Sequence, residues 1–134
     1  FLPATIVVLG LDNAGKTTLV NSLIGGLLCI SGAASCCLNM CLIVYFLLAC
    51  ADFDESTPTV GFERSILEHK NFRIQFYGLG GGSSFRGLWS HYFDEVHGAI
   101  FVVDSTDEKR LDEARHTFLE SAAEKRLNGK PILV

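Results

Sequence analysis

The first third of this 134-residue chain has almost no charge. Asp12 and Lys16 are the only charged side chains before Asp52, so 24 of the 26 charged residues lie from Asp52 onward. The formal net charge is −4, and no stripe of lysines and arginines is present. Proteins that bind nucleic acid use such a stripe to contact phosphates. We therefore expect no nucleic-acid partner, and the length suits a single domain.

Patterns that hold zinc or form a disulfide framework are missing too. All five cysteines fall inside the charge-free stretch: Cys29, Cys36, Cys37, Cys41 and Cys50. Their spacing includes no C-x-x-C and no histidine lies near them, which disfavours a zinc site. The number is odd, and no segment resembles a cleavable secretory signal. We expect these cysteines to be small apolar residues of a cytoplasmic protein, in a reducing compartment.

Four segments have the pattern of β-strands. Residues 5–9 and 99–103 are apolar on both faces and are expected to form buried strands. Residues 63–69 and 72–79 predict two strands, which the Lys70-Asn71 pair would join in a tight hairpin.

Helical patterns alternate with these strands. A helix is expected to start at residues 17–23, and residues 107–125 predict an amphipathic helix with Leu111, Ala114, Phe118 and Ala122 on its apolar face. Residues 131–134 then predict the beginning of another strand. Alternating strands and helices indicate an α/β fold, with an open, mostly parallel sheet covered by helices on both faces.

A glycine-rich loop follows the first predicted strand. It reads Gly10-Leu-Asp-Asn-Ala-Gly15-Lys16-Thr17 and matches the phosphate-binding motif G-x-x-x-x-G-K-[ST] at every required position. In this motif backbone N–H groups cradle phosphate oxygens, Lys16 reaches the β and γ phosphates, and the Thr17 hydroxyl binds Mg²⁺. The nucleotide-binding residues predicted here are Gly10, Leu11, Asp12, Asn13, Ala14, Gly15, Lys16, Thr17 and Thr18.

Several segments resemble the Arf-like small GTPases, both in their amino-acid sequence and in their order along the chain. They are GLDNAGKTT, PTVGF, GGGSSFRGLWSHYF and FVVDSTDEKRLDEAR, and the closing GKPILV with the triple glycine 80–82 is most similar to the ciliary Arf-like thirteen branch. The resemblance covers most of residues 5–26 and 54–134. It implies that residues 1–134 are a partial P-loop small-GTPase domain that is truncated at its C-terminal end.

The resemblance also assigns residues to the two switch segments. Thr59 matches the switch-one threonine, which would join Thr17 in binding Mg²⁺ and sense the γ-phosphate. Gly81 matches the switch-two glycine whose N–H contacts that phosphate. The aromatic residues presented to effectors would be Phe62, Tyr77 and Tyr92, for which core packing is the alternative role.

The implied function is a GTP-binding switch that recruits effectors and responds to exchange factors. The branch further implies cytoplasmic trafficking at a cilium or flagellum, with peripheral association with membranes. Nothing in the chain identifies a lipidation signal, because it starts at Phe1 without the segment where acylation occurs in the family.

Two glycines stand where the family has functional side chains. Gly78 replaces the aspartate that holds Mg²⁺ through water, and Gly82 stands at the position of the glutamine that orients the attacking water, where the Arf-like thirteen branch also has glycine. No residue is therefore assigned as catalytic, and GTP hydrolysis is expected to be slow. The alternative function is a degenerate scaffold or interaction module that retains the fold and hardly binds nucleotide.

The chain stops before the family's guanine-reading segments. Val134 lies in the strand that would lead to N-K-x-D, and the later S-A-K segment is absent as well. The preference for guanine therefore follows from the resemblance alone. We also expect the missing elements to leave one edge of the sheet exposed, so that the fragment is unstable by itself.

Residues 27–51 form an apolar insert that the resemblance does not cover. This stretch of 25 residues has no charge and is long enough to cross a bilayer as a helix. A single crossing would put Thr17 and Thr59 on opposite sides of the membrane, where they could not share one Mg²⁺. A translated retained intron or a faulty gene model is the favoured explanation of this stretch. A third explanation is a helical insert that packs on the domain or extends the first helix.

Overall fold

The computed structural model describes residues 2–30, 60–69 and 71–134 of the chain. Its centre is a five-stranded sheet in the order β2-β3-β1-β4-β5. The strands are β1 (Leu2–Leu9), β2 (Phe62–His69), β3 (Phe72–Leu79), β4 (Gly98–Phe101) and β5 (Ile132–Leu133). All neighbouring pairs are parallel except β2 and β3. The mostly parallel α/β sheet predicted from the sequence is confirmed.

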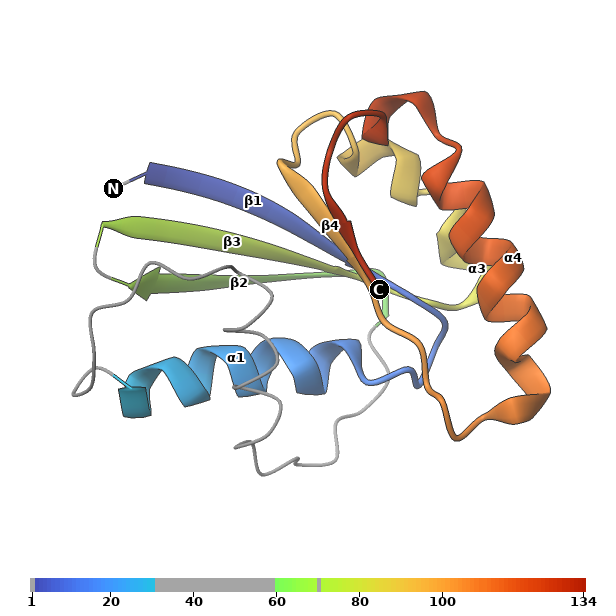
Figure 1. Ribbon diagram of the computed structural model, residues 1–134, viewed down its shortest axis with the longest axis horizontal. Coiled ribbons are helices and arrows are strands. Elements are labelled where there is room, and N and C mark those ends of the chain that lie inside the picture. The colour runs from blue at the N-terminus through green and yellow to red at the C-terminus, as the bar shows by residue number, and fades with distance from the viewer. Residues whose placement is uncertain (1, 31–59, 70) are drawn as a thin grey trace.

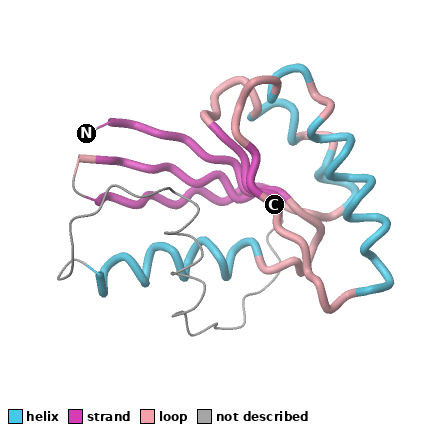
Figure 2. The backbone as a smooth tube through the Cα atoms, in the orientation of Figure 1, coloured by secondary structure: helices cyan, strands magenta, loops and turns pink. Residues whose placement is uncertain are grey.

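Helices lie on both faces of this sheet (Figure 1). Helix α1 (Lys16–Ile30) covers one face, and α3 (Ser83–Arg86) and α4 (Leu111–Ala122) lie on the other. Three short 3₁₀ helices complete the described part of the chain: η1 (Trp89–Tyr92), η2 (Glu108–Arg110) and η3 (Lys125–Leu127). Figure 2 shows that the loop after β1 and the loop after β4 leave the sheet at the same end.

Strand β1 separates two hydrophobic cores. Its side chains alternate in direction, so Ile6 and Val8 pack toward α1 while Val7 and Leu9 pack toward the opposite face. The first core also contains Leu19, Val20, Leu23, Leu67, Phe76 and Ile100. The second contains Leu79, Trp89, Phe93, Val96, Ala99, Phe101 and Leu127. A central strand buried on both faces explains why residues 6–9 are apolar without interruption.

The helix predicted over residues 107–125 is divided in the structure. Its residues form η2, α4 and the start of η3, and α4 ends at Ala122. Leu111 was expected on the apolar face, yet 39% of its surface is exposed, whereas Thr117 is only 5% exposed. The buried face of α4 is therefore rotated toward Ala114, Thr117 and Phe118, and Phe118 packs edge-on against Phe101 with ring centroids 5.3 Å apart.

The apolar insert falls largely outside the described residues. Residues 27–30 continue the backbone of α1 to its end at Ile30, and residues 31–51 lie outside the described part. Within the ranges 2–30, 60–69 and 71–134, none of the helices combines the length and the apolarity that crossing a bilayer requires.

Candidate phosphate-binding site

The loop between β1 and α1 is shaped by backbone conformations that glycine favours. Gly10 has φ of 141°, and a Cβ atom there would lie 2.3 Å from the carbonyl oxygen of Val102. Gly15 and Asn13 have φ of 91° and 58°. These turns bring the chain from the end of β1 to the first turn of α1, where the Leu19 N–H donates to the Gly15 carbonyl at 2.8 Å. The positive end of α1 therefore faces the loop.

Lys16 lies folded back over this loop. Its Nζ donates hydrogen bonds to the carbonyl oxygens of Leu11 at 2.6 Å and Gly10 at 3.1 Å, and the residue is only 7% exposed. Burial lowers the pKa of Lys16 from 10.5 to about 8; the carboxylate of Asp12 opposes this shift and the guanidinium of Arg86 adds to it. An anion in the loop would favour the charged form of Lys16 and raise this pKa again.

The outer side of the loop is held by Arg110 from η2. Its guanidinium donates to both the carboxylate and the carbonyl oxygen of Asp12 at 3.0 Å, and its Nε donates to Asp107 at 2.6 Å. Asp107 and Asp12 thus share one arginine. Asp12, at a position that the motif leaves open, is thereby connected to the segment that precedes α4.

Gly81 lies directly on the backbone of the phosphate loop. A Cβ atom at this position would lie 2.3 Å from the Asp12 nitrogen and 2.4 Å from the Gly10 carbonyl oxygen. The neighbouring Gly80 donates its N–H to the Gly61 carbonyl at 2.7 Å and accepts a hydrogen bond from Trp89 Nε1 at 3.0 Å. The close approach therefore connects the loop with both segments that flank the β2–β3 hairpin.

Arg86 links the same glycine to helix α4. Its Nε donates to the Gly81 carbonyl at 3.0 Å, and its Nη2 pairs with Glu113 at 2.7 Å. Arg86 and Trp89 thus both donate hydrogen bonds to the glycine turn, at the carbonyl oxygens of Gly81 and Gly80 respectively. Trp89 is 3% exposed.

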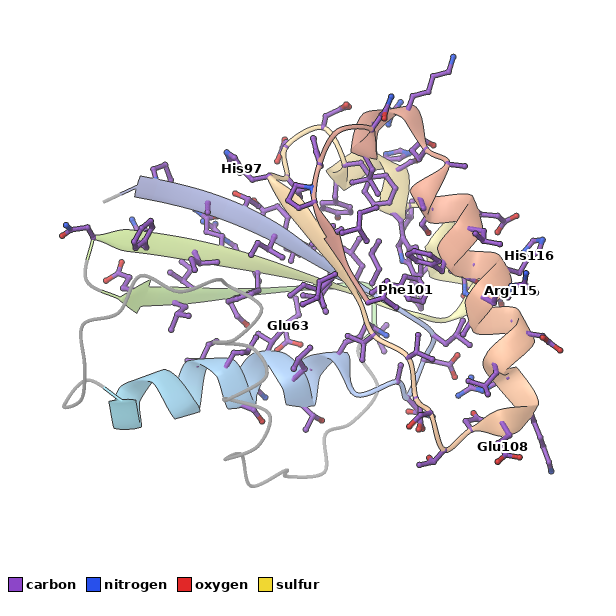
Figure 3. All side chains as sticks on the ribbon, in the orientation of Figure 1. Glu63, His97, Phe101, Glu108, Arg115 and His116 are labelled. Carbon is purple, nitrogen blue, oxygen red and sulfur yellow. The ribbon has the colours of Figure 1, made fainter. Side chains whose placement is uncertain are left out.

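A contact that the sequence did not predict joins the loop to β2. The Thr17 hydroxyl donates to Glu63 Oε2 at 3.3 Å, which is long for an O–H···O hydrogen bond. Glu63 lies between β2 and α1 in Figure 3. The signal was present in the sequence: a hairpin centred on residues 70 and 71 pairs residue 63 with residue 78, and this pairing is observed.

Hard oxygen donors make this the place where the described residues fit Mg²⁺. The Thr17 hydroxyl and the Glu63 carboxylate are oxygen groups of the kind that Mg²⁺ prefers. Among the described residues there is no group of three or more His, Cys, Asp or Glu side chains that could hold a metal. A magnesium ion here would depend on nucleotide phosphates for most of its charge.

The three aromatic residues assigned to effector binding contact one another. The rings of Phe62 and Tyr92 stack with centroids 5.2 Å apart, and Tyr77 meets both edge-on at 5.3 and 6.1 Å. Phe62 is 43% exposed. The cluster packs Tyr77 and Tyr92 against the second core, as the core-packing role predicts. It also presents an exposed aromatic edge, as effector binding requires.

Not every predicted site residue falls in the described part of the chain. Thr18 lies in the first turn of α1 beside Thr17, and both are half-buried. Thr59, assigned to Mg²⁺ and the γ-phosphate, lies outside the described residues. The structure thus brings together the loop, Gly81 and the hairpin, and leaves the position of Thr59 as a prediction.

The sequence of this chain is similar to those of a known protein family. Residues 42–134 match the ADP-ribosylation factor family. Over 97% of its length the chain is 36% identical to ADP-ribosylation factor-like protein 13B of Chlamydomonas reinhardtii, and over 98% it is 34% identical to ADP-ribosylation factor-like protein 3 of that organism. The chain spans only 20% and 60% of the lengths of these two relatives, respectively.

Solved structures give the same fold. The Arl6 BBS3 small GTPase of Trypanosoma brucei, solved with a bound nucleotide analogue, GppNp, is similar with a TM-score of 0.67 and 27% identity. That likeness covers 93% of this chain and 57% of the other. The mammalian SRP receptor, at 17% identity and a TM-score of 0.65, shares the fold over 96% of this chain and 58% of its own.

The close approach of Gly81 predicts a cost for any side chain there. We expect Gly81→Ala to lower the free energy of unfolding by about 1–3 kcal/mol, because its methyl group would overlap the loop backbone. Gly82→Ala is the matched control: its Cβ would lie 3.5 Å from the Phe85 ring, and it should cost less than about 0.5 kcal/mol. Urea unfolding measures both values, and equal values would show that Gly81 does not touch the loop.

The lowered pKa of Lys16 predicts a pH dependence of stability without nucleotide. Between about pH 8 and 10.5 the unfolded chain keeps a proton that folded Lys16 releases, so the free energy of unfolding should rise with pH. We expect the protein to gain about 1–3 kcal/mol relative to Lys16→Met as the pH rises through this window. Urea unfolding of both proteins over the range measures the difference, and parallel curves would contradict the buried lysine.

Proposed function

Because the chain belongs to the ADP-ribosylation factor family, we propose that it is a nucleotide-dependent switch that binds GTP or GDP with Mg²⁺ and recruits effectors. One observation carries the proposal: Gly81 lies on the backbone of a phosphate loop whose lysine is buried and ready to meet an anion. The loop would bind the phosphates through its N–H groups and the positive end of α1.

Binding of the nucleotide would rearrange the contacts of Lys16. Its Nζ would exchange the carbonyl oxygens of Gly10 and Leu11 for phosphate oxygens, which carry full negative charge. Thr17 and Thr59 would hold Mg²⁺, which supplies positive charge against the β and γ phosphates. The Gly81 N–H would contact the γ-phosphate, as the family resemblance implies.

A path of contacts would carry the state of the nucleotide to the surface. Gly81 is linked through Gly80 to Gly61 and Trp89, and Gly61 directly precedes Phe62 of the aromatic cluster. A shift of Gly81 by the γ-phosphate would therefore move the exposed face of Phe62, Tyr77 and Tyr92. We assign effector binding to this face, and nucleotide release to exchange-factor proteins.

The cellular role belongs to the same proposal. The resemblance to the ciliary Arf-like thirteen branch supports guanine as the base, and trafficking in the cytoplasm at a cilium or flagellum with peripheral contact to membranes. The competing function is a scaffold that keeps the fold and binds little nucleotide. Gly78 and Gly82 favour that alternative, because each removes a side chain that the family uses on the nucleotide.

The switch predicts that nucleotide affinity depends on Lys16. We expect Lys16→Ala to weaken binding of GDP and GTP by about 10- to 150-fold, because a charge-assisted hydrogen bond contributes about 1.5–3 kcal/mol. Lys109→Ala removes an exposed lysine of η2 and should leave affinity unchanged. Isothermal titration in the presence of Mg²⁺ measures each value. No heat of binding to the unmodified protein would support the scaffold instead.

Hydrolysis is expected to be slow, and Gly82 gives a direct test. Gly82 has φ of −61° and ψ of 147°, which any residue adopts, and its Cβ position is in ordinary contact with Phe85. Glutamine therefore fits there, and Gly82→Gln should raise single-turnover GTP hydrolysis by roughly 10- to 100-fold by orienting the water. Gly82→Ala supplies no amide and should stay slow; an equal rate for both variants would show that Gly82 does not limit hydrolysis.

A further inference from the structure

Glu63 lies where the lost aspartate would have placed its charge. Residue 63 pairs with Gly78 in the antiparallel ladder of β2 and β3, and Leu67 and Phe76 on the same two strands pack toward α1. Because side chains alternate along a strand, residues 63 and 78 point to that same face. A Cβ atom built on Gly78 would lie 3.8 Å from the Cβ of Glu63.

The Glu63 carboxylate also reaches the residue expected to bind the metal. Its Oε2 accepts the hydroxyl proton of Thr17 at 3.3 Å. A threonine hydroxyl that donates its proton in this way keeps its lone pairs for a cation. Neighbouring groups that accept hydrogen bonds from metal ligands raise the ligands' basicity and contribute to metal affinity.

We propose that Glu63 supplies the carboxylate that Gly78 has lost, so that the Mg²⁺ site of the nucleotide is completed from β2 instead of β3. The inference rests on the proposed function, since it concerns the metal of a bound nucleotide. Its basis is the juxtaposition of Thr17, Glu63 and Gly78. An aspartate at 78 and a glutamate at 63 would place two carboxylates side by side on one face of the sheet, and this chain holds only the glutamate.

The charge of Glu63 can be removed with little change in shape. The full chain is loaded with fluorescent GDP, and the rate of GDP dissociation is measured as Mg²⁺ is titrated. We expect Glu63→Gln to raise the Mg²⁺ concentration that half-maximally slows dissociation by about 10-fold or more, because the variant removes a negative charge beside a metal ligand, and changes to such neighbouring groups weaken metal binding by about 10- to 100-fold. Because the glutamine amide oxygen can still accept the Thr17 proton, a role limited to that hydrogen bond would leave the midpoint unchanged.

Glu68→Gln is the matched control. Glu68 lies on the same strand, is about half exposed and pairs with Arg73 at 3.1 Å, so this variant removes the same charge away from the loop. It should leave the Mg²⁺ midpoint where it is in the unmodified protein. A shift as large as that of Glu63→Gln would assign the effect to net charge and overturn the proposal.

A second substitution tests whether a carboxylate at residue 78 can replace the one at residue 63. Gly78 is not among the described residues with positive φ, and the nearest atom to its Cβ position is 3.7 Å away, so aspartate fits there. In the Glu63→Gln background, Gly78→Asp should restore the Mg²⁺ midpoint. In the unmodified background the same change would place two carboxylates side by side and should not improve it. Failure to restore the midpoint would overturn the proposal, with circular dichroism confirming that the variants fold.

The outcomes separate this inference from the function on which it rests. If the protein binds GDP tightly in a Mg²⁺-dependent way and Glu63→Gln leaves the midpoint unchanged, the proposed switch stands and the role of Glu63 is wrong. If the unmodified protein binds no GDP at any Mg²⁺ concentration, the switch itself fails and the inference fails with it.

Discussion

The burial of β1 on both faces is the constraint on which the rest of the structure depends. Val7 and Val8 are fully buried on opposite sides of the sheet, so the strand can neither shift its register nor turn over without exposing one core. This fixes the point at which the strand ends, and Gly10 follows immediately. There the chain approaches Val102 too closely for any side chain, so the phosphate loop takes its position from the packing of the sheet.

Gly81 connects that loop to other elements of the structure. The same backbone that would cradle phosphate also contacts Gly81, and Arg86 connects Gly81 to Glu113 of α4. Arg110 holds the opposite side of the loop through Asp12. An anion entering the loop would therefore meet backbone that is held on two sides by contacts to the segment formed by η2 and α4. Gly80, next to Gly81, also connects this site to the hairpin through its hydrogen bond to Gly61.

Local patterns predicted most of the fold and only part of the site. The strands, the antiparallel hairpin and the loop followed from apolar runs and from the motif, because each depends on neighbouring residues in the chain. The break of the helix around Arg110 did not, because that residue leaves the helical pattern to reach Asp12, which is 98 positions away in sequence. Thr117 was missed because hydroxyl residues are normally exposed, whereas here the Arg86 side chain comes within 3.5 Å of it.

The proposed role of Glu63 illustrates how a motif compared position by position can miss a group supplied by a neighbouring strand. Read position by position, the change from aspartate to Gly78 removes a carboxylate. In the folded chain the ladder brings the adjacent strand's carboxylate to the same face, within reach of Thr17. The glycine at 82 has no such neighbour across a ladder, because it lies past the end of β3 at the start of α3. Under this proposal the two glycines have different consequences: the cross-strand partner would compensate for the glycine inside the sheet, so metal binding would persist while hydrolysis would stay slow.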